Sequence, residues 1–143
     1  MVNDSKLVHI GCCRFLTMIS HLVITITLLL SREENVRACL SLDHSRPEFE
    51  RKDVELATGL GAAIGLIIIE FMGFLSGLSM FGAPSVTLIS ITAHASATVA
   101  LGYFALDVWD CDLYWWIFAL CSALPALLEI FLLIGVLGLK KTA

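Results

Sequence analysis

The chain has 143 residues, of which 58% are hydrophobic and only 15% are charged, and its formal net charge is −4. A soluble domain carries about a quarter charged residues, so this composition, with a mean hydropathy of +0.89, argues against a soluble domain and favours the lipid bilayer as solvent. The basic residues do not gather on one face, which argues against nucleic acid, and the cysteines lack zinc-site spacing, so neither metal nor cofactor is expected.

The first hydrophobic block predicts a membrane-spanning helix over residues 11–30. Residues 15–30 carry no charge, and a bilayer core about 30 Å thick needs roughly 20 apolar residues per helix. Arg14 lies near one end of this block, where we expect its side chain to extend to the lipid headgroups. A cleaved signal peptide is the alternative, but the apolar run is too long and residues 31–34 offer no small-residue cleavage site.

Residues 31–55 form the longest hydrophilic segment and are predicted to be an exoplasmic loop. Within it, Ser45 and Glu48 have the spacing of a capping box, in which each side chain accepts a backbone hydrogen bond at the start of a helix. We therefore predict that a helix begins at this point and continues into the second span.

The next segment must fold back on itself. Between Leu56 and Leu106 the only acidic or basic residue is Glu70, and a single helix of that length would be about 75 Å long. Residues 82–85 combine a glycine suited to a helix end with a proline tolerated in the first turn of the next helix. The sequence therefore predicts a tight antiparallel hairpin of spans at residues 56–80 and 85–106.

A fourth span is predicted at residues 114–139, with a kink at Pro125, which removes the backbone hydrogen bond to the carbonyl of Cys121. The predicted fold is therefore all-α: a polytopic membrane protein with one domain, residues 1–143, formed by a four-helix transmembrane bundle with short loops. Lys140 and Lys141 follow span 4, whereas residues 107–112 before it contain no basic residue, so we expect both termini in the cytoplasm.

Each span carries one titratable side chain in its interior: His21, Glu70, His94 and Glu129. A charged group at mid-depth costs about 2.5–3.5 kcal/mol on insertion scales, so we expect these four to face the bundle interior in one layer. Helical spacing places Arg14 on the face of His21, and Ser90 on the face of His94.

Two interpretations of this layer remain open. The first is a set of interhelical hydrogen bonds, about 0.6 kcal/mol each, that fix the register of the bundle. The second is a path for protons or ions, because intramembrane Glu and His are common relay groups. The small size of the protein and the lack of inverted repeats favour the first.

Span 2 carries two small-residue patterns, Gly61-x-x-x-Gly65 and Gly73-x-x-x-Gly77. Glycines four residues apart let a second helix backbone approach closely. We therefore predict that these four glycines are helix-packing positions.

The cysteines divide between the two sides of the membrane. Cys39 and Cys111 are predicted to lie in exoplasmic loops, an oxidising setting, where they form either a disulfide or two free thiols, depending on a Cα separation that the sequence does not give. Cys12 and Cys13 lie at the predicted cytoplasmic edge of span 1 and are either S-palmitoylation sites or ordinary interfacial thiols.

The sequence offers no catalytic motif. It contains no G-x-S-x-G, no H-E-x-x-H and no P-loop, so we expect a protein that is not an enzyme. Lys140 and Lys141 have the form of a dilysine retrieval signal for the endoplasmic reticulum, although basic anchoring beside span 4 explains them more simply.

Many short segments resemble the transmembrane protein 107 family, whose members are small four-span proteins of the ciliary transition zone. The similar segments are RFLT (14–17), HLV (21–23), ACL (38–40), GFLSG (73–77), SMF (79–81), LISI (88–91), AH (93–94), SA (96–97), VAL (99–101), YW (114–115), IF (117–118), CSALPA (121–126) and GLKK (138–141). They cover nearly the whole chain with similar spacing, which makes the resemblance more specific than any single motif.

The resemblance implies a non-enzymatic scaffold in the Meckel syndrome-associated module at the base of the primary cilium, supporting cilium assembly, the ciliary membrane diffusion barrier and Hedgehog signalling. It implies other transmembrane proteins of the transition zone, tectonics and meckelin-like proteins, as partners beside the lipid bilayer, and it implies no catalytic residue or cofactor. The alternatives are a small proton- or ion-coupled carrier or channel, and a resident of the endoplasmic reticulum. The sequence does not predict the oligomeric state.

Overall fold

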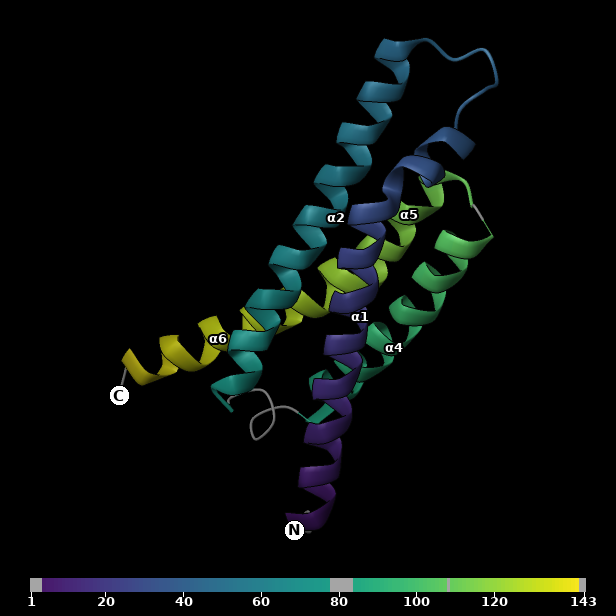
Figure 1. The fold of residues 1–143 in the computed structure, drawn as a ribbon. Coiled ribbons are helices and arrows are strands. Elements are labelled where there is room, and N and C mark those ends of the chain that lie inside the picture. Colours follow the sequence, from purple (N-terminus) through teal and green to yellow (C-terminus); the bar gives the residue numbers. More distant parts are fainter. Residues whose placement is uncertain (1–3, 78–83, 108, 142–143) are drawn as a thin grey trace.

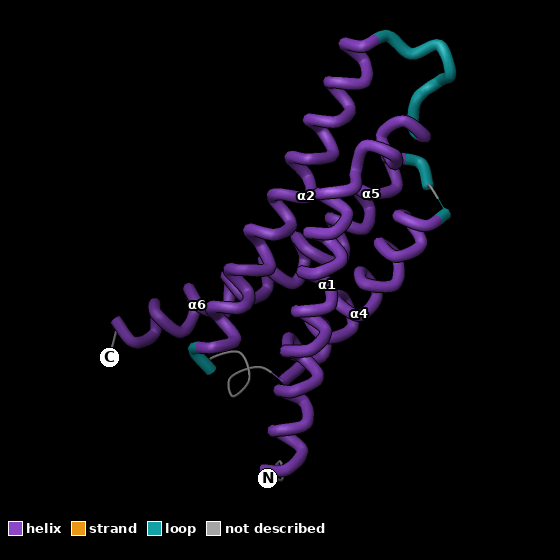
Figure 2. The backbone as a smooth tube through the Cα atoms, in the orientation of Figure 1, coloured by secondary structure: helices purple, strands orange, loops and turns teal. Residues whose placement is uncertain are grey.

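The computed structural model describes residues 4–77, 84–107 and 109–141. Its elements are helices α1 (Asp4–Ala38), α2 (Arg46–Leu75), α4 (Pro84–Leu106), α5 (Cys111–Phe118) and α6 (Leu124–Lys141), with a π-helical turn, η1 (Ala119–Ala123), between the last two. The described residues contain no strand (Figure 2). Four segments are long and apolar enough to cross a membrane, Val8–Ala38, Arg46–Leu75, Pro84–Leu106 and Cys111–Val136, which confirms the predicted all-α, four-span fold.

Helix α1 lies between α2 and α4 and packs along both (Figure 1). The continuous segment α5–η1–α6 contacts α2 and α4. Both chain termini lie toward the end of the bundle where α2 ends and α4 begins, while the connections after α1 and after α4 lie at the opposite end (Figure 1). This arrangement is what four alternating crossings produce.

Because α1 lies between them, α2 and α4 do not form the predicted tight hairpin. The extensive helix contacts of the bundle are those of α1 with α4 and with α2, whereas α2 and α4 approach each other closely at few backbone positions. They meet instead through polar side chains, because Glu70 of α2 contacts Ser90 and His94 of α4. The hairpin prediction was wrong because adjacency in sequence was taken as adjacency in the bundle.

The hydrophilic segment after span 1 is mostly helical, not a 25-residue loop. α1 continues to Ala38 and α2 begins at Arg46, so the connection shrinks to residues 39–45. The extension of α1 is amphipathic: Asn35 and Val36 are buried, while the Arg37 guanidinium pairs with Glu33 one turn earlier. Burial of one face and the ion pair on the other keep this charged stretch helical.

Ser45 precedes α2 as predicted, but it does not act through its side chain. The N–H groups of Glu48 and Phe49 donate to the Ser45 main-chain carbonyl, at 3.1 and 3.2 Å, and the hydroxyl makes no capping hydrogen bond. The capping-box pattern therefore predicted the start of α2 correctly, but the hydrogen bonds there involve the Ser45 carbonyl and not its side chain.

The C-terminal end of α2 comes earlier than predicted. α2 ends at Leu75, and Gly77 has a φ of 73°, in the left-handed region where glycine is favoured. Gly77 therefore ends the helix, and its predicted role in helix packing stays a prediction. Residues 82 and 83 of the predicted break lie outside the described residues, and Pro84 is the first residue of α4.

The predicted irregularity at Pro125 takes the form of a π-helical turn just before the proline. The Leu124 N–H donates to the Ala119 carbonyl, five residues back. Because Pro125 has no N–H, a normal α-helical register would leave the Cys121 carbonyl without a donor, and a wider turn at this point accommodates that loss. α5 and α6 consequently run in different directions (Figure 1).

The end of the bundle opposite the termini is closed by side-chain links. A disulfide joins Cys39 to Cys111, with a Cα separation of 5.7 Å, and so connects the segment after α1 to the start of α5. The buried Asn35 amide donates to the Phe104 carbonyl of α4 at 2.9 Å. Together these contacts fix α1 against the two segments that flank the connection after α4.

Gly59 is the glycine of α2 that allows close packing at this end. A Cβ atom at this position would lie 2.7 Å from Cε1 of Tyr114 and 3.3 Å from Cη2 of Trp115. Tyr114 is almost fully buried, so its ring cannot move aside without disturbing its neighbours. A Cβ at Gly61, two residues further along, would meet nothing within 4 Å.

We predict that Gly59→Ala lowers the free energy of unfolding by about 1–3 kcal/mol, the usual cost of overpacking. This cost exceeds the gain in helix propensity, at most about 1 kcal/mol. Thermal and denaturant unfolding of the purified protein in detergent would measure it. Gly61→Ala is the matched control and should leave stability unchanged or slightly raised; equal effects of the two substitutions would contradict the packing at Gly59.

Candidate functional site: a buried polar core

Five ionisable side chains from four helical segments meet inside the bundle. Arg14 and His21 come from α1, Glu70 from α2, His94 from α4 and Glu129 from α6. None is more than 1% exposed. The structure thus brings the four predicted residues into one buried group, which we call the polar core, and adds Arg14 to them.

The first half of the polar core is built around the Arg14 guanidinium. Its Nη2 forms an ion pair with Glu129 Oε2 at 2.9 Å, linking α1 to α6. Its Nε donates to the Ser90 hydroxyl at 3.3 Å, and this hydroxyl donates to Glu70 Oε2 at 3.1 Å. Ser90 therefore connects the arginine to the second carboxylate, and α4 to both α1 and α2.

The second half of the polar core is a histidine pair. His94 Nε2 lies 3.1 Å from Glu70 Oε2, and His94 Nδ1 lies 2.8 Å from Nδ1 of His21. One of the two Nδ1 atoms must carry the hydrogen and the other must accept it. The contacts run without a break from Glu129 through Arg14, Ser90, Glu70 and His94 to His21.

Arg14 does not extend to the headgroups as predicted. Its side chain is fully buried, and its guanidinium carbon lies 5.7 Å from the centre of the Phe74 ring. The ion pair with Glu129 makes an inward position favourable, since each charge would otherwise enter the bilayer uncompensated. The face shared with His21 was the sequence signal for this position, and the location near the end of the apolar block outweighed it in the prediction.

Gly73 is required by the polar core. A Cβ at this position would lie 2.8 Å from Cδ of Glu129 and closer still to its Oε1. The missing side chain of Gly73 thus provides the space into which α6 inserts its carboxylate beside α2. The glycine spacing predicts that a second helix backbone approaches Gly73. In the structure the group that approaches Gly73 is the Glu129 side chain.

The other glycine pattern on α2 faces away from the described parts of the bundle. Gly61 and Gly65 are exposed, and a Cβ at either position would meet nothing within 4 Å. Within this chain the prediction of close packing at Gly61 and Gly65 was therefore wrong. The physical reason is orientation, because these two glycines lie on the outward face of α2.

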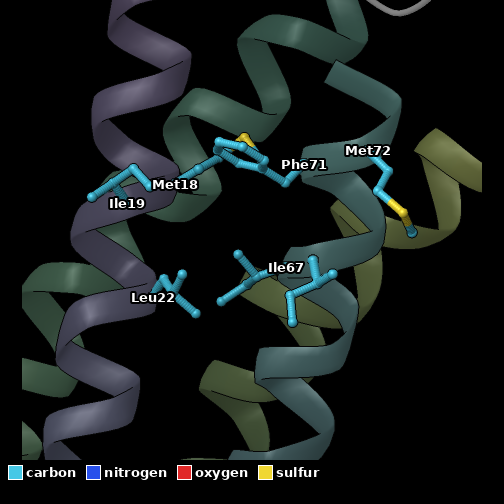
Figure 3. Close-up of a pocket in the computed structure, with 7 residues that line it drawn as sticks. Met18, Ile19, Leu22, Ile67, Phe71 and Met72 are labelled. Atoms are coloured by element: carbon cyan, nitrogen blue, oxygen red, sulfur yellow. The ribbon is translucent and has the colours of Figure 1, made fainter. Parts of the chain in front are cut away.

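An apolar groove of about 150 Å³ runs between α1 and α2 beside the polar core. Figure 3 shows Met18, Ile19 and Leu22 of α1 opposite Ile67, Phe71 and Met72 of α2, with Phe71 reaching across toward α1. The lining atoms are hydrocarbon and sulfur, which offer dispersion contacts only. The groove therefore brings no chemistry to the polar core.

The polar core is suited to holding hydrogen bonds and protons between helices. Among the described residues, no group of three or more His, Cys, Asp or Glu side chains could hold a metal ion. The strong links are charge-assisted contacts between different helices. Lipid chains have no donors or acceptors that could compete for these contacts. Such contacts select one register among the many that apolar packing alone permits.

Comparison with known proteins gives a consistent result. The TMEM107 family model, described as "Transmembrane protein", matches residues 11–133. "Transmembrane protein 107" of Xenopus laevis is 51% identical over 128 residues, which cover 90% of this chain and 91% of the relative. The proteins of the same name from Homo sapiens and Danio rerio are 49% and 42% identical, covering 90% and 85% of this chain and 91% and 90% of the relatives. No solved structure gives a significant match.

We predict a strong energetic coupling between Arg14 and Glu129. Arg14→Met or Glu129→Met alone should destabilise the protein by about 3–5 kcal/mol, because each leaves a buried charge without its partner. The double variant, which removes both charges, should be clearly more stable than the sum of the single effects predicts. Unfolding of the four proteins in bicelles would give the cycle; additive effects would show that the two side chains do not interact.

Proposed function

The chain belongs to the transmembrane protein 107 family, and from this membership we propose that it is a non-enzymatic membrane scaffold of the ciliary transition zone. In this role it retains other membrane components of the Meckel syndrome-associated module, and thereby supports cilium assembly, the ciliary membrane diffusion barrier and Hedgehog signalling. The observation that carries the proposal is sequence identity of about half over nine-tenths of the chain.

The architecture supports recognition within the membrane. The connection between α1 and α2 is only residues 39–45, and that between α4 and α5 is residues 107–110. Loops of this length leave little room for a soluble binding surface or an active site. Partners would therefore be other transmembrane helices, which we propose to be those of tectonics and meckelin-like proteins.

The outward face of α2 offers one such contact surface. Gly61 and Gly65 lie four residues apart on this face, and a Cβ at either position would have no atom of another described segment within 4 Å. Exposed small residues at this spacing allow a partner helix to approach the backbone closely. We propose this face as part of the partner-binding surface of the scaffold.

The buried position of the polar core supports a structural role over transport. A carrier must expose its intramembrane carboxylates to water on each side in turn. Glu70 and Glu129 are at most 1% exposed, and each is tied to a neighbouring helix by hydrogen bonds or an ion pair. The contacts thus favour a fixed bundle.

The disulfide supports the proposed orientation. Disulfides persist in the oxidising exoplasmic compartment, so the end of the bundle with Cys39 and Cys111 would face it. The termini lie toward the opposite end (Figure 1). The free thiols of Cys12 and Cys13 are in the N-terminal part of α1. We therefore propose that both termini are cytoplasmic, as the positions of Lys140 and Lys141 also favour.

We predict that the tagged protein concentrates at the base of the primary cilium in ciliated cells, next to a basal-body marker. Glu70→Gln should show the same location, because the amide keeps hydrogen-bonding capacity in the polar core. Fluorescence imaging of both proteins at matched expression would test this. Diffuse endoplasmic reticulum signal with none at the cilium base would contradict the proposed location.

We predict that Gly65→Ile reduces the recovery of transition-zone membrane proteins several-fold in proximity labelling, without loss of folded protein. A Cβ at this exposed position has no atom of another described segment within 4 Å, and the larger side chain would hold a partner helix away from α2. Ala95→Ile, on the outward face of α4, is the matched control and should leave recovery unchanged. Unchanged recovery with Gly65→Ile would exclude this face as the contact surface.

A further inference from the structure

The polar core contains unequal numbers of fixed charges. Arg14 contributes one positive charge, whereas Glu70 and Glu129 together contribute two negative charges when ionised. The other ionisable side chains of the polar core are His21 and His94, which are neutral unless they bind a proton. Tyr114, also buried, lies outside the polar core against Gly59 and adds no charge in its protonated form. With both histidines neutral and both carboxyls ionised, the sum is one negative charge.

A net charge at this depth is costly. The side chains of the polar core are at most 1% exposed, so water does not solvate them. An uncompensated charge in the middle of a membrane helix is unfavourable, because the hydrocarbon around the helix cannot solvate it. Binding a single proton removes this charge.

We infer that the polar core is a proton-binding site, which holds one proton shared between Glu70 and His94, with His21 as the hydrogen-bond partner of His94. The proton is taken from water when the bundle forms, and the only bond made is an O–H bond on Glu70 or an N–H bond on the His94 ring. The inference concerns the chemistry of the polar core and does not depend on the proposed scaffold function.

The geometry places the proton at the Glu70 end of the polar core. The Arg14 guanidinium lies 2.9 Å from Glu129 Oε2, where its positive charge faces that carboxyl group. Glu70 has no such cation: Oε2 receives the Ser90 hydroxyl and faces His94 Nε2, while Oε1 has no hydrogen-bond partner among the described residues. The polar core is one positive charge short, and the carboxyl group that lacks a cation is that of Glu70.

The two histidines extend the site beyond Glu70. In one form, the Glu70 carboxyl donates its hydrogen to His94 Nε2; in the other, a protonated His94 donates from Nε2 to the carboxylate. The 2.8 Å contact between the two Nδ1 atoms holds one further hydrogen in either form, donated by one ring to the other. A protonated His94 donates at both nitrogens, and His21 accepts.

This proton gives the bundle a defined dependence on pH. The groups that face the site are Arg14 and His21 of α1, Glu70 of α2, His94 of α4 and Glu129 of α6. Loss of the proton in alkaline solution leaves one negative charge inside the bundle, and a second proton in acid leaves one positive charge. Stability should therefore fall on both sides of an intermediate pH.

Nitrogen NMR of ¹⁵N-histidine-labelled protein in lipid bilayers would test the proposal directly, together with infrared detection of a protonated carboxyl. The protein has four histidines; His9 and His44 lie outside the polar core and serve as reference signals. We expect one proton at neutral pH, seen either as a charged His94 ring or as a protonated Glu70 carboxyl. Two neutral buried rings with both carboxyls ionised would overturn the proposal, as would a proton on Glu129.

Glu129→Gln provides the sharper test. This residue contacts Arg14 and not the histidines, but its neutralisation leaves Arg14 and Glu70 with balanced charges. We therefore expect the proton signal at Glu70 and His94 to be lost, and the alkaline decrease in thermal stability with it. Glu33→Gln, at an exposed site, is the control and should keep both. Retention of the proton in folded Glu129→Gln would show that charge balance does not determine it.

Discussion

The structure depends on one constraint: a polar group that enters the hydrocarbon region must find its partner inside the protein. The backbone meets this requirement by forming helices, and the side chains meet it by converging on one region. Arg14 reaches Glu129 and Ser90, and Ser90 in turn reaches Glu70. Because the partners lie on different helices, satisfying the side chains also fixes how the helices are rotated and how far each is displaced along its axis.

The sequence was sufficient for features that depend on local chemistry. The number of spans follows from block length, and the four titratable residues follow from their isolation within apolar blocks. The arrangement of the helices around the bundle could not be predicted from local sequence. Nothing local states that α1 lies between α2 and α4, and that position is what separates the two helices of the expected hairpin.

Arg14 shows how two local rules can give opposite predictions. A position near the end of an apolar block favours extension to the headgroups, whereas a shared face with His21 favours the interior. The deciding fact is the presence of Glu129 on a helix more than a hundred residues away in sequence. A long basic side chain at a span end therefore cannot be assigned from its own span alone.

The glycines of α2 make the same point about small residues. Gly59 and Gly73 are buried, against Tyr114 and Glu129 respectively, whereas Gly61 and Gly65 face outward. The G-x-x-x-G spacing records that two glycines share a face, but it carries no information about which direction that face points. The inward glycines differ from each other by fourteen residues, close to four helical turns, so they mark the interior face of α2. That face was visible in the sequence only once Glu70, three residues before Gly73, was known to point inward.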